Sequence, residues 1–246
     1  MSWTEAFFGK YYLKTHLPIL TEQKTNLEVD FIESVLKLEK GSKILDIPCG
    51  HGRHANQLAK RGYQVTGIDN QPDFIDLAKV ESDSNSTFQT QDMRTINFKN
   101  EFDAVINLFT SFGYFSEEEN LSFLKKMVDS LKIGGKLLID TVNREWTMNH
   151  TGKINQAWLV YPPDNITFLA NNSFDVFTSR IYSAQVIVDQ GERYEQNQDI
   201  RLYSFTEIKM YLGMMGMELL QVFGNMNKDD YSVTSNSMVI LCQKIK

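Results

Sequence analysis

The sequence contains only two cysteines, Cys49 and Cys242, and its four histidines are scattered along the chain. So few cysteines argue against a disulfide framework and indicate a reducing compartment, so we expect a cytoplasmic protein. No Cys/His cluster has the spacing of zinc ligands, and we therefore expect no metal site.

Long apolar runs and dense blocks of basic residues are also absent. No stretch approaches the length needed to span a bilayer, and the N-terminus lacks the charged and apolar regions of a secretory signal. The formal net charge of −6 argues against a standing nucleic-acid surface. We therefore expect a partner other than a membrane or a nucleic acid.

The composition is that of one α/β enzyme domain with an elaboration. The 246 residues include 42% hydrophobic residues and 16 phenylalanines, which are ample for a core. Apolar runs at 43–47, 65–69, 86–90 and 102–109 alternate with segments of helical periodicity, which predicts right-handed crossovers and a parallel sheet. Final strands are expected at about 217–223 and 237–244, with capping boxes beginning helices at Ser116 and Ser204.

The most informative segment runs from Lys43 to His54 and is followed by a second apolar run that ends in Asp69. It predicts a buried strand, a glycine loop, a helix start and a second strand ending in an acid. Gly50 and Gly52 let the backbone pass close under a ligand, and the helix N-terminus favours a carboxylate there. Asp69 can accept hydrogen bonds from both hydroxyls of a ribose. This layout predicts a nucleoside-binding crevice.

A dinucleotide enzyme satisfies much of this pattern, but two departures disfavour a nicotinamide oxidoreductase. Asp46 ends the first strand, where it would repel a pyrophosphate but can engage a cationic amino group. Pro48 and Cys49 replace the usual lead into the glycine turn. Ala55 stands at the third position of the fingerprint, which its relaxed form tolerates.

At these residues the chain resembles the class I S-adenosylmethionine-dependent methyltransferases. Residues 45–52 are similar to their first motif, in which a glycine is more usual at the position of Pro48. Residues 91–93, 102–109 and 131–140 agree with later motifs in order and spacing. The resemblance implies S-adenosylmethionine as the cofactor. It also implies a Rossmann-like seven-stranded sheet, mostly parallel with the last strand antiparallel, and helices on both faces.

The resemblance also implies a set of residues around the cofactor. The expected contacts are Tyr12, Asp46, Pro48, Gly50, Gly52, Arg53, Asp69, Asn70, Asp92, Met93, Asn107 and Leu108. Asp69 matches the ribose-binding acid, and Asp92 matches the acid that accepts from the adenine amino group. Simpler interpretations stay open: Asp69 as a helix cap, Asp92 as a loop acid and Arg53 as a solvated side chain.

Two elaborations are expected on the single domain of residues 1–246. An aromatic segment from Trp3 to Tyr12 either packs as a helix or, with the helix to about residue 38, forms a lid in which Tyr11 or Tyr12 covers the cofactor. Residues of about 147–203 contain short strand-like segments, which predict a small antiparallel sheet inserted over the carboxyl ends of the main strands. Turns are expected at 164–165, at 171–172 and at Gly191.

The sequence therefore predicts methyl transfer to a nitrogen or oxygen of a small molecule, by a monomer or homodimer. Alternatives are an RNA or protein methyltransferase, or a protein that binds S-adenosylmethionine without turnover. No residue has a spacing that compels a catalytic role. Side chains expected on the loops after strands four and five, over the reaction centre, are Tyr114, Asp140, Asn143, Arg144 and His150.

Overall fold

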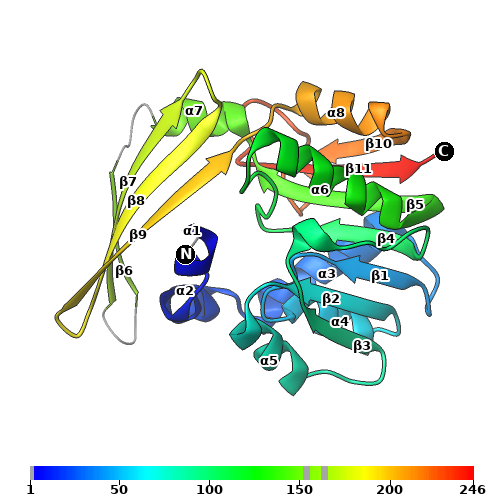
Figure 1. Cartoon of the computed structure of the whole chain (residues 1–246), viewed down its shortest axis with the longest axis horizontal. Coiled ribbons are helices and arrows are strands. Elements are labelled where there is room, and N and C mark those ends of the chain that lie inside the picture. Colours follow the sequence, from blue (N-terminus) through cyan, green and yellow to red (C-terminus); the bar gives the residue numbers. More distant parts are fainter. Residues whose placement is uncertain (1–2, 152–155, 162–165) are drawn as a thin grey trace.

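A computed structural model describes residues 3–151, 156–161 and 166–246, and its main element is a seven-stranded sheet (Figure 1). The strand order is β10-β11-β5-β4-β1-β2-β3. Pairing is parallel from β5 to β3, whereas β11 is antiparallel to both of its neighbours. The strands are β1 (Lys43–Asp46), β2 (Gln64–Asp69), β3 (Ser86–Thr90), β4 (Phe102–Asn107), β5 (Leu131–Val142), β10 (Met217–Phe223) and β11 (Ser237–Lys244). The predicted Rossmann-like sheet with an antiparallel last strand is confirmed.

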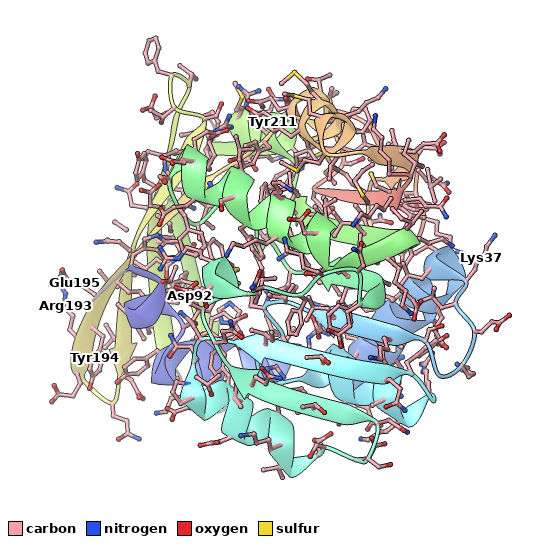
Figure 2. The ribbon with its side chains drawn as sticks, turned by 45° about the vertical axis from the view of Figure 1, so that its right-hand side comes forward. Lys37, Asp92, Arg193, Tyr194, Glu195 and Tyr211 are labelled. Carbon is pink, nitrogen blue, oxygen red and sulfur yellow. The ribbon has the colours of Figure 1, made fainter. Side chains whose placement is uncertain are left out.

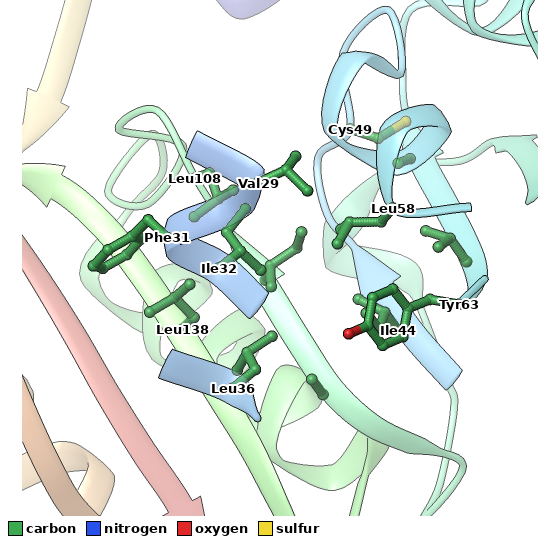
Figure 3. Close-up of a cluster of buried hydrophobic side chains, with 14 of the residues drawn as sticks. Val29, Phe31, Ile32, Leu36, Ile44, Cys49, Leu58, Tyr63, Leu108 and Leu138 are labelled. Carbon is green, nitrogen blue, oxygen red and sulfur yellow. The ribbon is translucent and has the colours of Figure 1, made fainter. Parts of the chain in front are cut away.

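Helices cover both faces of this sheet because its central strands are apolar on both sides. Ile44 of β1 packs toward one face and Leu45 toward the other, and both are buried. The first face is covered by α3 (Glu22–Leu36), α4 (Arg53–Lys60) and α5 (Pro72–Val80), and the second by α6 (Glu117–Ser130) and α8 (Phe205–Met214). Figure 3 shows Ile32 and Leu36 of α3 packed toward Leu138.

Helix α3 matches its expected buried face in part. Leu27, Phe31, Val35 and Leu38 recur at helical spacing, which predicts that they are buried on one face; Phe31 and Val35 are buried, but Leu27 is 62% exposed. The buried face is centred on a stripe through Val29, with Ile32 and Leu36, and the helix ends at the left-handed C-cap Lys37, one residue before Leu38. The capping boxes predicted at Ser116 and Ser204 are both present.

A second, four-stranded antiparallel sheet is inserted between β5 and α8. Its strands are β6 (Gln156–Tyr161), β7 (Ile166–Asp175), β8 (Arg180–Asp189) and β9 (Glu192–Arg201), in that order. The turn expected at residues 171–172 is wrong, because Asn171 and Asn172 lie inside β7 and pair with Ala184 and Ser183 of β8. The turn expected at residues 164–165 falls outside the described residues.

The N-terminal helices lie between the two sheets (Figure 1). They are α1 (Trp3–Phe7), α2 (Lys10–His16) and the short 3-10 helix η1 (Leu17–Ile19). The indole Nε1 of Trp3 donates to the carbonyl of Tyr114, 3.3 Å away, which ties α1 to the loop after β4. Two further elements are the 3-10 helix η2 (Met93–Thr95) and α7 (Arg144–Thr151). Among the described residues, no helix is both long and apolar enough to cross a membrane.

Candidate cofactor site

A cavity of about 890 Å³, including the part open to solvent, lies at the carboxyl ends of β1, β2 and β4. Ligands of open α/β sheets bind at this edge. Most of the predicted cofactor residues meet in its wall: Tyr12, Asp46, Pro48, Gly50, Arg53, Asp69, Asn70, Asp92, Met93 and Leu108. These residues meet because β4, β1 and β2 are adjacent parallel strands. The residues that follow each strand therefore lie at the same edge of the sheet.

The two glycines of the loop after β1 have different surroundings. Gly50 has φ +54°, and a Cβ added to it would meet no atom within 4 Å. Its N–H donates to Oδ2 of Asp69 at 2.9 Å. Gly52, the N-cap of α4, has φ +78°, and an added Cβ would lie 2.6 Å from the Cβ of Ala78. Gly50 thus leaves space in the cavity that a side chain would occupy, while Gly52 lets α4 pack against α5.

Asp46 is a buried carboxylate in the cavity wall. In the part of the chain that the structure describes, its Oδ2 has no hydrogen-bond partner. Burial raises the pKa of Asp46 to about 8, and the nearby charge of Asp69 adds to the rise, although Arg53 opposes it. A buried carboxylate in this state is stabilised by an incoming cation. The position therefore fits the amino group of a methionine moiety.

Asp69 joins the glycine loop to the end of β2. Its Oδ2 accepts from Gly50 N and its Oδ1 from Gln71 N, each at 2.9 Å. Burial raises the pKa of Asp69, and these backbone hydrogen bonds oppose the rise. Each carboxylate oxygen has a second lone pair, so Asp69 retains the capacity to accept from ribose hydroxyls.

Arg53 is paired rather than solvated. Its guanidinium forms an ion pair with Glu28 of α3, and its carbon Cζ lies 5.5 Å from the ring centroid of Phe109. The Nε2 of His54 lies 2.8 Å from the same Glu28 carboxylate. Burial raises the pKa of Glu28, but His54 and Arg53 outweigh it and bring the pKa to about 2. Glu28 of α3 therefore already balances the positive charge of Arg53 in the cavity wall.

Asp92 follows β3 and faces the inserted sheet (Figure 2). Its carboxylate accepts from the backbone and guanidinium of Arg94, with 2.7 Å between Nη2 and Oδ2. Arg94 also donates to Glu119 at 2.6 Å. Burial raises the pKa of Asp92, yet the hydrogen bonds from Arg94 lower it overall. Asp92 is therefore ionised and held in place. No motif in the sequence indicated Arg94 as its partner.

Tyr12, not Tyr11, lines the cavity. The Tyr12 ring stacks on His16 with 4.0 Å between centroids and lies 5.7 Å from Phe74. Burial raises the pKa of Tyr12 to about 12, so the hydroxyl stays neutral. Tyr11 points away, with its ring 4.3 Å from that of Tyr194 in β9.

Other predicted residues lie outside the cavity wall. Asn107 is fully buried and donates from Nδ2 to the carbonyl of Ile47 at 2.7 Å. Asp140 accepts from Phe109 N, and Asn143 donates to the carbonyls of Ser232 and Ser235. Both side chains therefore hold backbone segments in place.

Three of the residues expected on loops are not on loops. Asp140 lies within β5, and Arg144 and His150 belong to α7, where Arg144 donates to Ser179 at 3.0 Å. Of the five residues expected over the reaction centre, only Tyr114 lines the cavity. Further lining residues that the sequence analysis did not select include His51, Phe109, Ser111 and Phe115. His51 and Phe109 belong to the segments 45–52 and 102–109 that carry the family resemblance, whereas Ser111 and Phe115 lie further along the loop after β4.

Comparison with known proteins agrees with this site. Residues 44–135 match a family model described as a methyltransferase domain. A Bacillus subtilis (strain 168) protein named as the methyltransferase YqeM is 28% identical over 222 residues, which cover 85% of this chain and 86% of that protein.

Two solved structures share the fold. An S-adenosylmethionine-dependent methyltransferase from Clostridium acetobutylicum superposes with a TM-score of 0.78, covering 95% of this chain and 96% of its own, at 16% identity. The sugar N-methyltransferase KedS8 from Streptoalloteichus sp. has a TM-score of 0.74, covering 97% and 94%, at 18% identity. The fold and site define a methyltransferase. These comparisons support the class I S-adenosylmethionine-dependent methyltransferases as the family of this chain, with S-adenosylmethionine as the cofactor.

Proposed function

We propose that this enzyme transfers the methyl group to a nitrogen or oxygen of a small-molecule acceptor. The observation that carries the proposal is the setting of the cavity, which lies at the carboxyl edge of the main sheet and is also lined by Thr4 of α1 and Tyr12 of α2. A cavity bordered in this way suits a small ligand better than a polymer. The net charge of −6 also argues against a nucleic-acid substrate. The sugar N-methyltransferase KedS8 shares the fold, which supports a small acceptor by analogy.

The cofactor contacts follow from the geometry of the wall. We assign the unpartnered Oδ2 of Asp46 to the cofactor's amino group, because that oxygen otherwise stays buried without a hydrogen bond. We assign Asp69 to the ribose. Asn70, Asp92 and Met93 follow β2 and β3 and lie on the adenine side of this arrangement.

The chain's own residues contribute positioning rather than covalent chemistry. When bound, S-adenosylmethionine supplies an electrophilic methyl group on a sulfonium. Asp46 and Asp69 fix the amino group and the ribose of the ligand, and orientation of this kind accounts for a large share of the rate enhancement in two-substrate reactions. Tyr114, which is buried, and Tyr12, which is partly buried, line the cavity and exclude water from it, and aromatic rings near a sulfonium add cation–π attraction.

We propose that residues 1–38 act as a lid and that residues 147–203 border the acceptor. Within these ranges α1 and α2 lie against the inserted sheet, and Tyr12 reaches the cavity. The two cysteines are free and buried, which accords with the cytoplasm as the proposed location. Monomer and homodimer both remain compatible with the proposal.

Calorimetric titration tests the cofactor site directly. We expect micromolar binding of S-adenosylmethionine and S-adenosylhomocysteine and no binding of NAD. Asp69→Ala should abolish the binding, while Asp76→Ala, an exposed position on α5, should leave it unchanged. Binding of NAD, or equal loss in both variants, would contradict the assignment. A screen of small amines and phenols for methylated product then tests the acceptor class.

A further inference from the structure

A second cavity of about 910 Å³, here named the side cavity, adjoins the cofactor cavity. Asn70, Asp92, Tyr114 and Phe115 line both. The outer wall of the side cavity comes from β8 and β9 of the inserted sheet, through Arg180 and Asp199. A ligand in the side cavity therefore lies between the inserted sheet and the cofactor site.

The charges of the side cavity are paired in its wall. Arg94 contacts Asp92 and Glu119, and Arg180 forms an ion pair with Asp199, with 2.5 Å between Nε and Oδ1. Three carboxylates thus face two guanidiniums. A phosphate or carboxylate ligand would find both cations already engaged and an acidic surplus around it. The wall therefore disfavours anionic ligands and tolerates a neutral or cationic one.

The ion pair of Arg180 with Asp199 leaves further hydrogen-bonding groups available, and they lie in the planes of the guanidinium and the carboxylate. Arg180 also donates from Nη1 to the carbonyl of Phe115 and from Nη2 to that of Asp199, at 3.1 and 3.2 Å. These contacts engage three of the five N–H groups of a guanidinium. Asp199 keeps further lone pairs. Adjacent donors and acceptors of this kind match vicinal hydroxyl groups, each of which donates and accepts.

Aromatic side chains supply the remaining wall. Trp3 of α1 and Phe115 line the side cavity, and Arg94 lies over the Phe115 ring at 4.4 Å. Indole and phenyl faces pack against the C–H faces of a ring while its hydroxyls reach the polar groups. The side cavity therefore combines apolar faces with paired charges.

The two carboxylates of the side cavity that contact Arg94 are weak bases. Hydrogen bonds from Ser116 and Arg94 lower the pKa of Glu119, and Arg94 lowers that of Asp92. Burial lowers the pKa of His51 to about 4. A hydroxyl acceptor needs a competent general base, whereas an amine needs only to arrive unprotonated. These surroundings favour a nitrogen nucleophile.

We propose that the side cavity binds the acceptor, and that the acceptor is a small, unphosphorylated amine bearing several hydroxyl groups, such as an amino sugar or an aminocyclitol. This inference rests on the proposed function. The amine lone pair forms a bond to the methyl carbon as the carbon–sulfur bond breaks, with its electron pair passing to sulfur. The product ammonium then loses a proton to solvent.

The first experiment follows methyl transfer from S-adenosylmethionine by mass spectrometry. The acceptors are D-glucosamine and 2-deoxystreptamine, with myo-inositol, tyramine, catechol and D-glucosamine 6-phosphate for comparison. We expect N-methyl product from the first two alone. A larger kcat/KM with tyramine, catechol or the phosphate overturns the inference while leaving the proposed function intact. Absence of cofactor binding instead contradicts the proposed function itself.

Arg180→Gln tests the side cavity, with Arg193→Gln on the neighbouring strand β9 as the matched control. Arg193 is exposed and paired with Glu195 on the outer part of the inserted sheet (Figure 2). Loss of a charge-assisted hydrogen bond predicts a rise of about tenfold in KM for the amine in Arg180→Gln. The Kd for S-adenosylhomocysteine should stay within about twofold in both variants. An unchanged KM in Arg180→Gln would overturn the placement.

A binding readout keeps the test independent of turnover. In the S-adenosylhomocysteine complex, 2-deoxystreptamine should shift the indole N–H signal of Trp3 in an NMR titration. The chain has three tryptophans, so Trp3→Phe assigns the signal. Failure of both hydroxylated amines to shift it at tens of millimolar would overturn the inference.

Discussion

Lys14 of α2 and Asp189 at the end of β8 form an ion pair with 2.6 Å between Nζ and Oδ2. The Asp189 side chain is 7% exposed and that of Lys14 is 30% exposed, so the pair is partly shielded from solvent. Two residues away from Lys14, Tyr12 lines the cofactor cavity. Together with the contact between the Tyr11 and Tyr194 rings, this ion pair holds the wall of the cofactor site against the inserted sheet.

Lys14→Met should therefore weaken cofactor binding although Lys14 does not line the cavity. Loss of the ion pair lowers the fraction of molecules with α2 in place, and the apparent Kd rises in proportion. A partly shielded pair contributes on the order of 1 kcal/mol, which corresponds to about fivefold in Kd. Calorimetry with S-adenosylhomocysteine measures this change in Kd. Lys37→Met, at the opposite end of the molecule (Figure 2), is the control. Equal affinity in both variants would show that the ion pair between Lys14 and Asp189 has no effect on cofactor binding.

The two loop glycines should separate stability from binding. In Gly52→Ala the new Cβ meets Ala78 at 2.6 Å with φ at +78°, so we expect a loss of about 2–4 kcal/mol in the free energy of unfolding. Gly191→Ala, at φ +87° with no atom within 4 Å, isolates the backbone cost, about 1 kcal/mol. Urea unfolding measures both. Similar losses in the two variants would contradict the packing role of Gly52.

Gly50→Ala should show the opposite balance. Its added Cβ meets no protein atom, so stability should fall by only about 1 kcal/mol, from the positive φ. The same Cβ projects into space at the cavity wall, so the Kd for S-adenosylmethionine should rise at least about tenfold. Calorimetry at a temperature at which Gly50→Ala and the wild type are both folded separates the effect on binding from the effect on stability. Unchanged affinity would remove Gly50 from the cofactor site.

The sequence predicted what local signals determine. Ser116 and Ser204 carried complete capping boxes, and the strand that ends in Asp69 followed from its apolar run. Contacts distant in sequence were not predictable in this way. Arg53 pairs with Glu28 of another helix, and nothing in the spacing of either residue indicates it. Asn171, a residue typical of turns, stays in β7 because strands on both sides satisfy its backbone.

Asp46 should make the ligand-free protein less stable as the pH rises. Its folded pKa of about 8 exceeds the ordinary value of 3.8, so between these values the unfolded chain ionises while the folded chain stays protonated. Stability is therefore lost progressively from about pH 4 to pH 8. Asp46→Asn removes this dependence and should stabilise the ligand-free protein at pH 8 by about 1–3 kcal/mol. Urea unfolding across this range measures the difference, and parallel pH profiles would contradict it.

The same group should link cofactor binding to proton release. An amino group bound at Asp46 favours the carboxylate, so binding below pH 8 should release a proton from the wild-type site. Calorimetry in buffers of different ionisation enthalpy measures this release at pH 7. Asp73→Asn, an exposed position in the first turn of α5, should behave as wild type. Wild-type binding with no net proton exchange would place the amino group elsewhere.

Glu28 should stabilise the fold at neutral pH and lose its effect in acid. Its folded pKa of about 2 lies below the ordinary 4.5, so its contribution is complete above about pH 4.5 and is lost as the pH falls toward 2. Glu28→Gln leaves Arg53 and His54 without their carboxylate and should cost about 2–3 kcal/mol at pH 7. Glu22→Gln, exposed in the first turn of the same helix, should cost only a few tenths of a kcal/mol. Chemical unfolding at pH 7 and at pH 2 measures the difference between the variants and wild type. If the Glu28→Gln deficit is as large at pH 2 as at pH 7, the carboxylate charge is not what joins α3 to α4.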